Sequence, residues 1–579
     1  ETVDALRQLR SEAPEDSSLK ALSFDEDICR YYPYGALLSQ VLGLTTVDSE
    51  GQSGLESRYE DVLRGTEGSY LRQVDARNRQ LDGTEGWYIP SQQGCGLVLT
   101  IDAEIQEMVE KAMRECIGVN QAQSVICLVS DVKTGAILAM CMNPCYDPND
   151  PPRNDVETLT ELMRLTAISD VYEPGSTFKI LTAASALDSG VTTPQDSFYC
   201  SAKIAVDGDT IRCWGRPHGA ETMADGLKNS CNPVFVELAL RMGTDTFYRY
   251  LTAFGLGKKT GIDLPGESLG ILITSRNVKR VDLARIGFGQ SVALTPIQMM
   301  MAANSVINGG KLMKPYIVSE IQTPDGETLE RFHPTVMAAP IRPETSDTMR
   351  LLLERVVSEG GGKNAAIAGY RIGGKTGTAQ VYKNGRVVRD THIGSFYGFA
   401  PVNDPQVSIL VIVKEADVPI DYGGTTAAPF ARQIMQEMLP YLGIEPENDE
   451  KDEEIEVPAL KGLTIGDAKR KLSQVGLESV TDGANTVVLD QLPPAGAKLV
   501  KGGHVMLYTA GSEELTPEEL VCVPDLTGLG DVDCARLVRQ RGLTMSMTGQ
   551  GLCTEQSPAA GEYVQPGTTI FLLMAGDDE

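Results

Sequence analysis

Three short polar motifs follow one another along this chain, and their order restricts its fold more than any other feature. Ser176-Thr-Phe-Lys179 comes first, Ser230-Cys-Asn232 follows, and Lys375-Thr-Gly-Thr378 comes last. A serine hydroxyl becomes a good nucleophile only beside a base, and a lysine three residues later in a helix lies within its reach. If the motifs serve one site, the fold must bring three segments that are distant in sequence to a single hydroxyl.

Two further Ser-x-x-Lys matches, at Ser17 and Ser130, compete with the first motif. Ser17 lies in a polar, acidic stretch, and Ser130 lies in a pattern typical of two strands joined by a turn. Residues 177–187 are apolar or small on every side, which predicts a buried helix. We therefore expect Ser176 at the N-terminus of a core helix and Lys179 in an apolar setting that lowers its pKa. The alternative, an N-cap serine followed by a surface lysine, fits this motif when it is taken alone.

The second motif stands just before a helical pattern. Pro233 follows Asn232 and begins an apolar stretch, so Asn232 is predicted to be the N-cap and Ser230 to lie in the preceding loop. A hydroxyl and an amide in that loop could relay a proton and hold a substrate carbonyl. Capping alone explains Asn232 equally well.

The third motif begins a predicted β-hairpin. Residues 375–382 precede Lys383-Asn-Gly-Arg386, a two-residue hairpin signal, and the partner strand is expected within residues 387–400. Further strand patterns occupy residues 406–413, 124–130 and 136–140. Together they predict one sheet of about five antiparallel strands.

The position of the third motif on that sheet suggests how it could act. Lys375 would border the serine, where its charge could bind a substrate carboxylate. The backbone N–H groups of Ser176 and Thr378 could form an oxyanion hole. Gly377 has no side chain and would let a substrate backbone approach the strand.

The motifs and their neighbours resemble a known family. Tyr172-Glu-Pro-Gly-Ser-Thr-Phe-Lys179, Ser230-Cys-Asn232 and Lys375-Thr-Gly-Thr378 look like the three active-site motifs of the penicillin-binding proteins, the serine D,D-transpeptidases of peptidoglycan synthesis. Residues 30–35, 54–65 and 99–106 are similar to the non-catalytic pedestal of class B members, which have no glycosyltransferase domain. The resemblance implies a class B protein.

The resemblance also implies a role for each motif residue. Ser176 would be acylated by a stem peptide ending in D-Ala-D-Ala, with Lys179 as general base and Ser230 as proton relay. Asn232 would bind the peptide, and the terminal carboxylate would be held by the third motif, which comprises Lys375, Thr376, Gly377 and Thr378. The family further implies β-lactam antibiotics as ligands and a membrane glycosyltransferase as partner. It places the catalytic domain on the outer face of the cytoplasmic membrane, behind a single-pass anchor that we expect to be absent from this sequence.

An internal repeat occupies the C-terminal part of the chain. Val457-Pro-Ala-Leu-Lys-Gly462 recurs 66 residues later as Val523-Pro-Asp-Leu-Thr-Gly528. Each unit reads as a helix followed by strands, and the two resemble the PASTA domains of sporulation and Gram-positive division transpeptidases.

We therefore expect a multidomain α+β protein. Its catalytic domain would contain the five-stranded antiparallel sheet between helices, and its two repeats would be small α/β units. An acidic run of eight Asp or Glu residues reads as a solvated linker before the repeats. The expected boundaries are 1–100 for the pedestal of dimerisation type, 101–444 for the transpeptidase domain, 445–456 for the linker, and 457–511 and 522–576 for the repeats.

Several other functions are disfavoured by the sequence. A net charge of −28 argues against nucleic-acid binding, which needs a basic face. We expect no cofactor and no metal, since the four histidines lie far apart and none pairs with another at ligand spacing. Cys200 and Cys213 flank a predicted hairpin, so a disulfide between them is a hypothesis. No run approaches the roughly 18 apolar residues of a membrane span.

Two rival functions stay open at this point. A β-lactamase or a β-lactam sensor could use the same three motifs, although neither needs a pedestal or C-terminal repeats. The chain could also be a non-catalytic scaffold that binds the cell wall through its repeats. Intact Ser176, Lys179 and Lys375 count against the scaffold.

Overall fold

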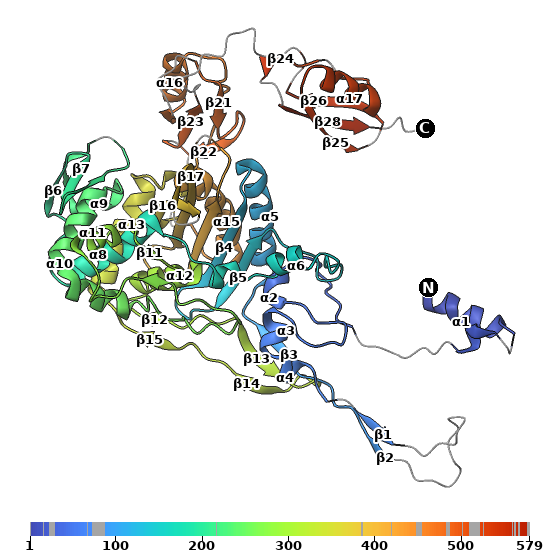
Figure 1. The fold of residues 1–579 in the computed structure, drawn as a ribbon. Helices are drawn as coiled ribbons and strands as arrows, with labels where there is room; N and C mark the ends of the chain where they lie inside the picture. The colour runs from blue at the N-terminus through green and yellow to red at the C-terminus, as the bar shows by residue number, and fades with distance from the viewer. Residues whose placement is uncertain are drawn as a thin grey trace. The chain divides into compact units, whose positions relative to one another are not determined.

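We describe the protein from a computed structural model (Figure 1). The description covers residues 2–575 except 15–16, 22–28, 67, 72–86, 216, 384–385, 419, 447–453, 482–486, 501, 509–520, 525, 550, 559, 561–562 and 565–567. The predicted turn residues Asn384 and Gly385 and most of the predicted acidic linker therefore lie outside it. The chain divides into two compact units, of which the first includes Glu1–Val457 and the second most of the C-terminal repeats.

The centre of the first unit is a five-stranded antiparallel sheet in the order β16-β17-β18-β4-β5. All five predicted strands are confirmed, with the bounds β4 (Ser124–Asp131), β5 (Ile137–Asn143), β16 (Gly373–Lys383), β17 (Arg386–Ala400) and β18 (Val407–Lys414). The hairpin β16–β17 pairs Lys383 with Arg386, as the turn signal predicts. Because β16 is at one end of this order, the third motif lies on an edge strand.

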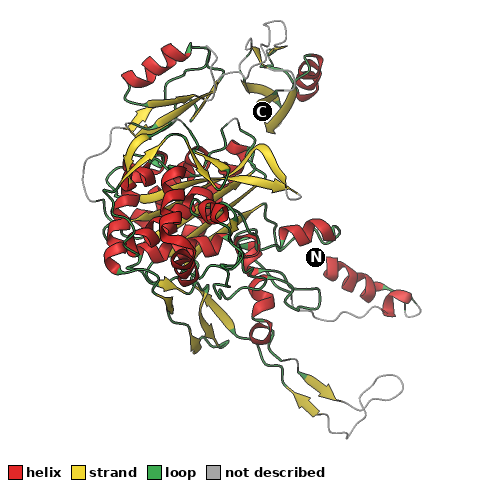
Figure 2. Ribbon diagram, turned by 60° about the vertical axis from the view of Figure 1, so that its left-hand side comes forward, coloured by secondary structure: helices red, strands yellow, loops and turns green. Residues whose placement is uncertain are grey.

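Both faces of this sheet are buried, which explains why β4, β5 and β18 are largely continuous apolar runs. Along β4, Ile126 and Leu128 belong to one core cluster, whereas Val125, Cys127 and Val129 belong to the other. The first cluster includes residues from α8 (Lys179–Asp188), α10 (Asn232–Ala253) and α12 (Pro296–Ile307), and the second includes residues from α5 (Ala103–Asn120) and α15 (Ala428–Tyr441). Helices therefore cover both faces, as predicted (Figure 2).

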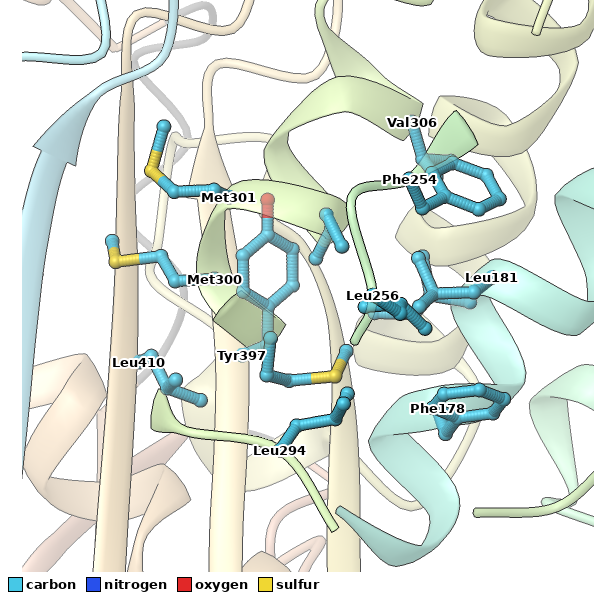
Figure 3. Packing of buried hydrophobic residues seen from close by; sticks show 14 of the residues in the cluster. Phe178, Leu181, Phe254, Leu256, Leu294, Met300, Met301, Val306, Tyr397 and Leu410 are labelled. Carbon is cyan, nitrogen blue, oxygen red and sulfur yellow. The ribbon is translucent and has the colours of Figure 1, made fainter. Parts of the chain in front are cut away.

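The helix that follows the first motif is fixed by this core. Leu181 and Leu256 lie between Phe254 and Phe178 in one buried cluster, and Tyr397 of β17 extends toward α12 (Figure 3). The hydroxyl of buried Tyr397 donates to Oδ1 of Asn304 (2.8 Å), whose Nδ2 donates to Oγ of Ser130 (3.4 Å). This chain of hydrogen bonds satisfies polar groups that burial would otherwise leave unpaired. The prediction that residues 177–187 form a buried helical segment is confirmed.

A small β-subdomain is inserted between α8 and α10. It pairs β6 with β9 and β7 with β8, and it ends in a short helix. Its elements are β6 (Ser197–Cys200), β7 (Lys203–Val206), β8 (Asp209–Arg212), β9 (Gly219–Thr222) and α9 (Met223–Lys228). The second motif follows α9 directly, so this subdomain lies next to the site.

The N-terminal region consists of short elements, and one of its strands joins a sheet with strands from the middle of the chain in the order β14-β13-β3. The N-terminal elements are α1 (Thr2–Glu12), η1 (Ser18–Ala21), α2 (Ser39–Leu42), α3 (Gly54–Arg58), α4 (Glu60–Leu63), β1 (Ser69–Leu71), β2 (Trp87–Ile89) and β3 (Gly96–Leu99). The remaining elements of the first unit are α6 (Val156–Leu162), α7 (Thr166–Ser169), η2 (Gly175–Phe178), β10 (Ile271–Leu272), α11 (Arg280–Ile286), β11 (Val292–Ala293), β12 (Leu312–Met313), β13 (Val318–Gln322), β14 (Thr328–Arg331), β15 (Val336–Ala338), α13 (Pro343–Ser358), η3 (Lys363–Ala365) and α14 (Gly423–Thr426).

The two C-terminal repeats contain equivalent elements in the same order. The first has β19 (Glu454–Glu456), α16 (Ile465–Gln474), β20 (Glu478–Thr481), β21 (Asp490–Leu492), β22 (Lys498–Val500) and β23 (His504–Tyr508), and the second has β24 (Val521–Cys522), α17 (Asp531–Gln540), β25 (Thr544–Gly549), β26 (Leu552–Ser557), β27 (Tyr563–Val564) and β28 (Thr569–Ala575). A glutamine makes the same contacts in both. Oε1 of Gln491 accepts from the N–H of Leu460, and Oε1 of Gln556 accepts from the N–H of Leu526, at 2.7 Å each.

Candidate active site

Ser176 lies in a 3-10 turn, η2, that runs directly into α8. Gly175 before it has a left-handed φ of 53°, and its N–H donates to the carbonyl oxygen of Gly289 (3.1 Å). A Cβ on Gly175 would lie 2.5 Å from the carbonyl oxygen of Thr378, so the turn comes very close to β16. Ser176 is half-buried and retains access to the surface.

Lys179 is fully buried in the first turn of α8. Its Nζ donates to the carbonyl oxygen of Ser230 (2.6 Å), to Oγ of Ser230 (3.2 Å) and to Oδ1 of Asn232 (2.7 Å). Within the described ranges, these acceptors all belong to the second motif. The base role needs a hydrogen bond from Ser176 Oγ as well, and such bonds often tighten only when substrate is bound.

Burial changes the protonation of both site lysines. Burial lowers the pKa of Lys179 to about 7, while the nearby Cys213, Cys231 and Glu221 act in the opposite direction. Burial, and then the charge of Lys179, lowers the pKa of Lys375 well below its usual value. An amine with a pKa of about 7 is partly neutral at neutral pH, as a general base must be.

The predicted N-cap in the second motif is wrong. α10 begins at Asn232 and its N-cap residue is Cys231, which makes no side-chain capping bond. Asn232 instead accepts from Lys179 through Oδ1 and donates from Nδ2 to the carbonyl oxygen of Arg212 (3.0 Å). The buried amine of Lys179 needs acceptors more than the exposed helix terminus does, so the side-chain amide of Asn232 faces the site. Ser230 has a left-handed φ of 56°, a strained backbone of the kind found at functional sites.

The third motif also contacts the hydroxyl of Ser230. Lys375 is fully buried on β16, and its Nζ donates to Oγ of Ser230 (3.0 Å) and to the carbonyl oxygen of Thr376 (3.1 Å). Ser230 therefore receives hydrogen bonds from the amines of both lysines. Thr376 and Thr378 are half-buried and share the other face of the strand, where Oγ1 of Thr378 accepts from the N–H of Gly423 (3.4 Å).

The structure gives Gly377 a role that differs from the sequence-based interpretation. A Cβ at this position would lie 2.4 Å from Oγ of Ser395, 2.9 Å from Cγ2 of Thr177 and 3.0 Å from the carbonyl oxygen of Pro174. The missing side chain therefore makes room for the neighbouring strand and for the turn that carries Ser176. The space is used by the protein itself.

The two rival Ser-x-x-Lys matches are not part of this site. Ser130 is fully buried within β4, and its Oγ accepts from Asn304. Lys133 lies on the exposed side, where its Nζ pairs with Asp404 (2.7 Å). Ser17 lies far earlier in the chain, just before the short helix η1, and it belongs to neither segment that contacts Ser230.

Sequence reasoning missed a cluster directly beside the second motif. Ligand atoms of Cys200, Cys213, His218 and Cys231 all lie within 4.8 Å of one another. The hypothetical disulfide is absent, since Cys200 and Cys213 are both free thiols. A signal was present, because intervals of 12, 4 and 12 residues separate these four positions. Histidine spacing alone does not detect this cysteine-based pattern.

Comparison with known proteins agrees with this geometry. Residues 125–436 match the profile of the penicillin-binding protein transpeptidase domain. The chain belongs to the penicillin-binding protein family. Residues 4–99 of this penicillin-binding protein match the penicillin-binding protein dimerisation domain, and residues 455–511 and 521–576 match the PASTA domain. The predicted class is confirmed: this is a class B serine D,D-transpeptidase with PASTA repeats.

Curated relatives include a sporulation protein and a peptidoglycan D,D-transpeptidase. Stage V sporulation protein D of Bacillus subtilis is 38% identical over 507 residues, which cover 86% of this chain and 78% of that protein. The peptidoglycan D,D-transpeptidase FtsI of Escherichia coli K12 is 30% identical over 430 residues, which cover 74% of this chain and 70% of that protein.

Solved structures show the same fold. Penicillin-binding protein 3 of Mycobacterium tuberculosis, in complex with ampicillin, superposes with a TM-score of 0.65 at 28% identity and covers 73% of this chain and 91% of its own. Its complex with aztreonam gives a TM-score of 0.63. None of the helices in the described ranges is both long and apolar enough to cross a membrane.

Proposed function

We propose that this penicillin-binding protein cross-links peptidoglycan stem peptides through an acyl-enzyme on Ser176, during division or sporulation. One observation carries the assignment: Lys179 and Lys375, from two distant segments, both donate to Oγ of Ser230 beside the turn of Ser176. The similarity to sporulation and division transpeptidases supports the pathway.

The proposed reaction assigns a task to each motif. Oγ of Ser176 attacks the carbonyl carbon of the penultimate D-Ala, and its proton passes to the neutral amine of Lys179. The N–H groups of Ser176 and Thr378 stabilise the oxyanion. As the peptide bond breaks, Ser230 passes a proton to the amine of the departing D-Ala. An amine of a second stem peptide then attacks the ester, releasing Ser176 and completing the cross-link.

Substrate binding falls to the remaining residues in this scheme. Asn232 is held by Lys179 and Arg212, so its amide is oriented toward a peptide in the site. Lys375, Thr376, Gly377 and Thr378 lie on an edge strand, where an extended peptide can add as a further strand. The terminal carboxylate of the stem peptide would lie near the Lys375 amine and the two threonine hydroxyls.

The acyl-enzyme can be tested by peptide mapping. After incubation of the full chain with benzylpenicillin, trypsin should release a penicilloyl adduct on the peptide 165–179, which contains Ser176 and lies between Arg164 and Lys179. The peptides with the rival serines, 11–20 and 115–133, serve as internal controls and should remain unmodified. An adduct on a control peptide, or no adduct at all, would contradict the proposal. Rapid release of the adduct would favour a β-lactamase.

Acylation should depend on pH through Lys179. The amine is neutral above its pKa of about 7 and protonated below it, so the second-order rate constant should rise through neutral pH and then level off. The pKa of about 7 already includes the effects of Cys213, Cys231 and Glu221 on the Lys179 amine. The Lys375 amine also interacts with it. Stopped-flow acylation by a chromogenic cephalosporin measures this profile. A rate constant that falls across neutral pH would contradict the base assignment.

We further propose a location and a partner for this protein. Peptidoglycan cross-linking takes place outside the cytoplasmic membrane, so the catalytic domain would work on that side. A class B protein forms cross-links without polymerising glycan, so a membrane glycosyltransferase is the expected partner. Chemical cross-linking of this protein in intact cells, with a reagent that does not cross the membrane, would test both proposals, with no glycosyltransferase adduct as the contradicting result.

A further inference from the structure

A second cluster of reactive side chains lies beside the second motif and has no part in the acyl-transfer scheme. Cys200 ends β6, Cys213 follows β8, His218 precedes β9, and Cys231 is the N-cap of α10. Cys200 and Cys231 are fully buried, while Cys213 and His218 are half-buried. They come from three segments, since Cys213 and His218 share the loop between β8 and β9, so the folded subdomain brings them together.

The spacing of these groups matches tetrahedral zinc. With the usual Zn–S and Zn–N bond lengths, two ligands of one ion lie about 3.5 to 3.8 Å apart. Sγ of Cys213 lies 3.8 Å from Nδ1 of His218, and all four ligand atoms lie within 4.8 Å of one another. Three thiols and one imidazole form a complete tetrahedral set, and this donor set selects zinc over magnesium or calcium.

A buried carboxylate lies next to the cluster, and its three thiols are free. Nδ1 of His218 lies 3.8 Å from Oε1 of Glu221, a carboxylate that is buried and accepts a hydrogen bond from Asn229 (3.2 Å). Because Nδ1 is also the ring nitrogen that lies 3.8 Å from Sγ of Cys213, it is the candidate ligand, and Glu221 lies next to the cluster. All four candidate ligands lie within 32 residues, and the three cysteines are free.

We propose that Cys200, Cys213, His218 and Cys231 bind one Zn²⁺ ion that anchors the loop of the second motif. Cys231 stands between Ser230 and Asn232, the two residues that hold Lys179. A metal bond to the Cys231 sulfur fixes the middle of this loop and supports the strained backbone of Ser230. The ion takes no part in acyl transfer and acts on the reaction only by positioning these residues.

Two hydrogen bonds couple the zinc ligands further to the site. Nε1 of Trp214, next to Cys213, donates to the carbonyl oxygen of Asn229, just before Ser230 (2.9 Å). The carbonyl oxygen of Arg212, on the other side of Cys213, accepts from Asn232 (3.0 Å). Loss of the ion is therefore expected to loosen both Ser230 and Asn232.

The proposal is tested first by metal analysis of the full chain, expressed with added zinc and purified under reducing conditions. We expect about one zinc ion per chain by elemental mass spectrometry. Exchange with Co²⁺ should give the intense visible bands of a tetrahedral cobalt thiolate. The variants Cys213→Ser and His218→Gln should each lower zinc affinity by about tenfold or more.

Two cysteine variants outside the cluster are matched controls. Cys116→Ser removes a thiol that is buried like Cys231, and Cys29→Ser removes an exposed one. Both should keep zinc and the cobalt spectrum. Trp214 is a local probe, since its ring lies 6.1 Å from that of His218, so metal removal should change its fluorescence in a Trp87→Phe background.

A second readout separates positioning from mere folding. Chelation should slow acylation of Ser176 by about 10²-fold while leaving the far-ultraviolet circular dichroism unchanged, and added zinc should restore the rate. The proposal is overturned if the wild type contains no zinc and gives no cobalt bands, or if zinc content is equal in the ligand variants. A disulfide between Cys200 and Cys213 in the isolated protein would also overturn it.

Discussion

Replacing Lys179 with methionine is expected to slow acylation by penicillin by about 10³-fold or more. Methionine fills a similar volume but cannot accept the proton of Ser176 Oγ. It also leaves the carbonyl oxygen of Ser230 and Oδ1 of Asn232 without the donor that each has at 2.6 and 2.7 Å. The rate constant for acylation, measured by intact-protein mass spectrometry over time, gives the effect.

Lys179→Arg is the matched control for this prediction. Arginine keeps a positive charge and hydrogen-bond donors, but its guanidinium does not deprotonate in proteins. If Lys179 acts as the base, the arginine variant should be about as slow as the methionine variant. Near-normal acylation by Lys179→Arg would show that the position needs only a charge, and it would refute the base role.

Replacing Gly289 with alanine is expected to destabilise the catalytic domain by about 3 kcal/mol. Gly289 has a left-handed φ of 85°, and an added Cβ would lie 2.0 Å from the carbonyl oxygen of Gly175 and 2.8 Å from Cβ of Phe178. The same methyl group would displace the turn that carries Ser176, so acylation should also slow by about 10²-fold. Urea unfolding, monitored by the loss of penicillin binding, measures the loss of stability.

Gly257 provides a control with the same backbone strain and no crowding. Its φ is 76°, and a Cβ there would meet no atom within 4 Å. Gly257→Ala should therefore cost only about 1 kcal/mol and leave acylation unchanged. Equal losses in the two variants would mean that backbone conformation, and not contact with the Ser176 turn, explains the effect at Gly289.

Local patterns sufficed for the sheet and for the helix of the first motif. The strands β4, β5 and β18 were predictable because each is a largely apolar run, and β16 and β17 because a two-residue hairpin signal joins them. The buried helix after Ser176 was predictable because its residues are apolar on every side. In both cases burial of neighbouring side chains decides the local structure, and the sequence records it directly.

The second motif was harder because its residues have two possible partners. Asn232 before Pro233 has the pattern of an N-cap, but in the fold Cys231 is the N-cap and the Asn232 amide binds Lys179 and Arg212. A local rule could not weigh a helix N–H group against a buried amine that lies 53 residues away in sequence.

The sequence by itself determined the domain types and the three motifs, from which the proposed roles of the site residues follow. Only the tertiary structure decided that Lys179 and Lys375 meet at Ser230 and that Gly377 makes room for the turn that carries Ser176. It also decided that three cysteines and His218 form one cluster. The physical reason is the sequence separation over which each interaction acts. Periodicity and turn residues act between near neighbours, whereas hydrogen bonds to a buried amine and metal coordination depend on which distant segments the core brings together.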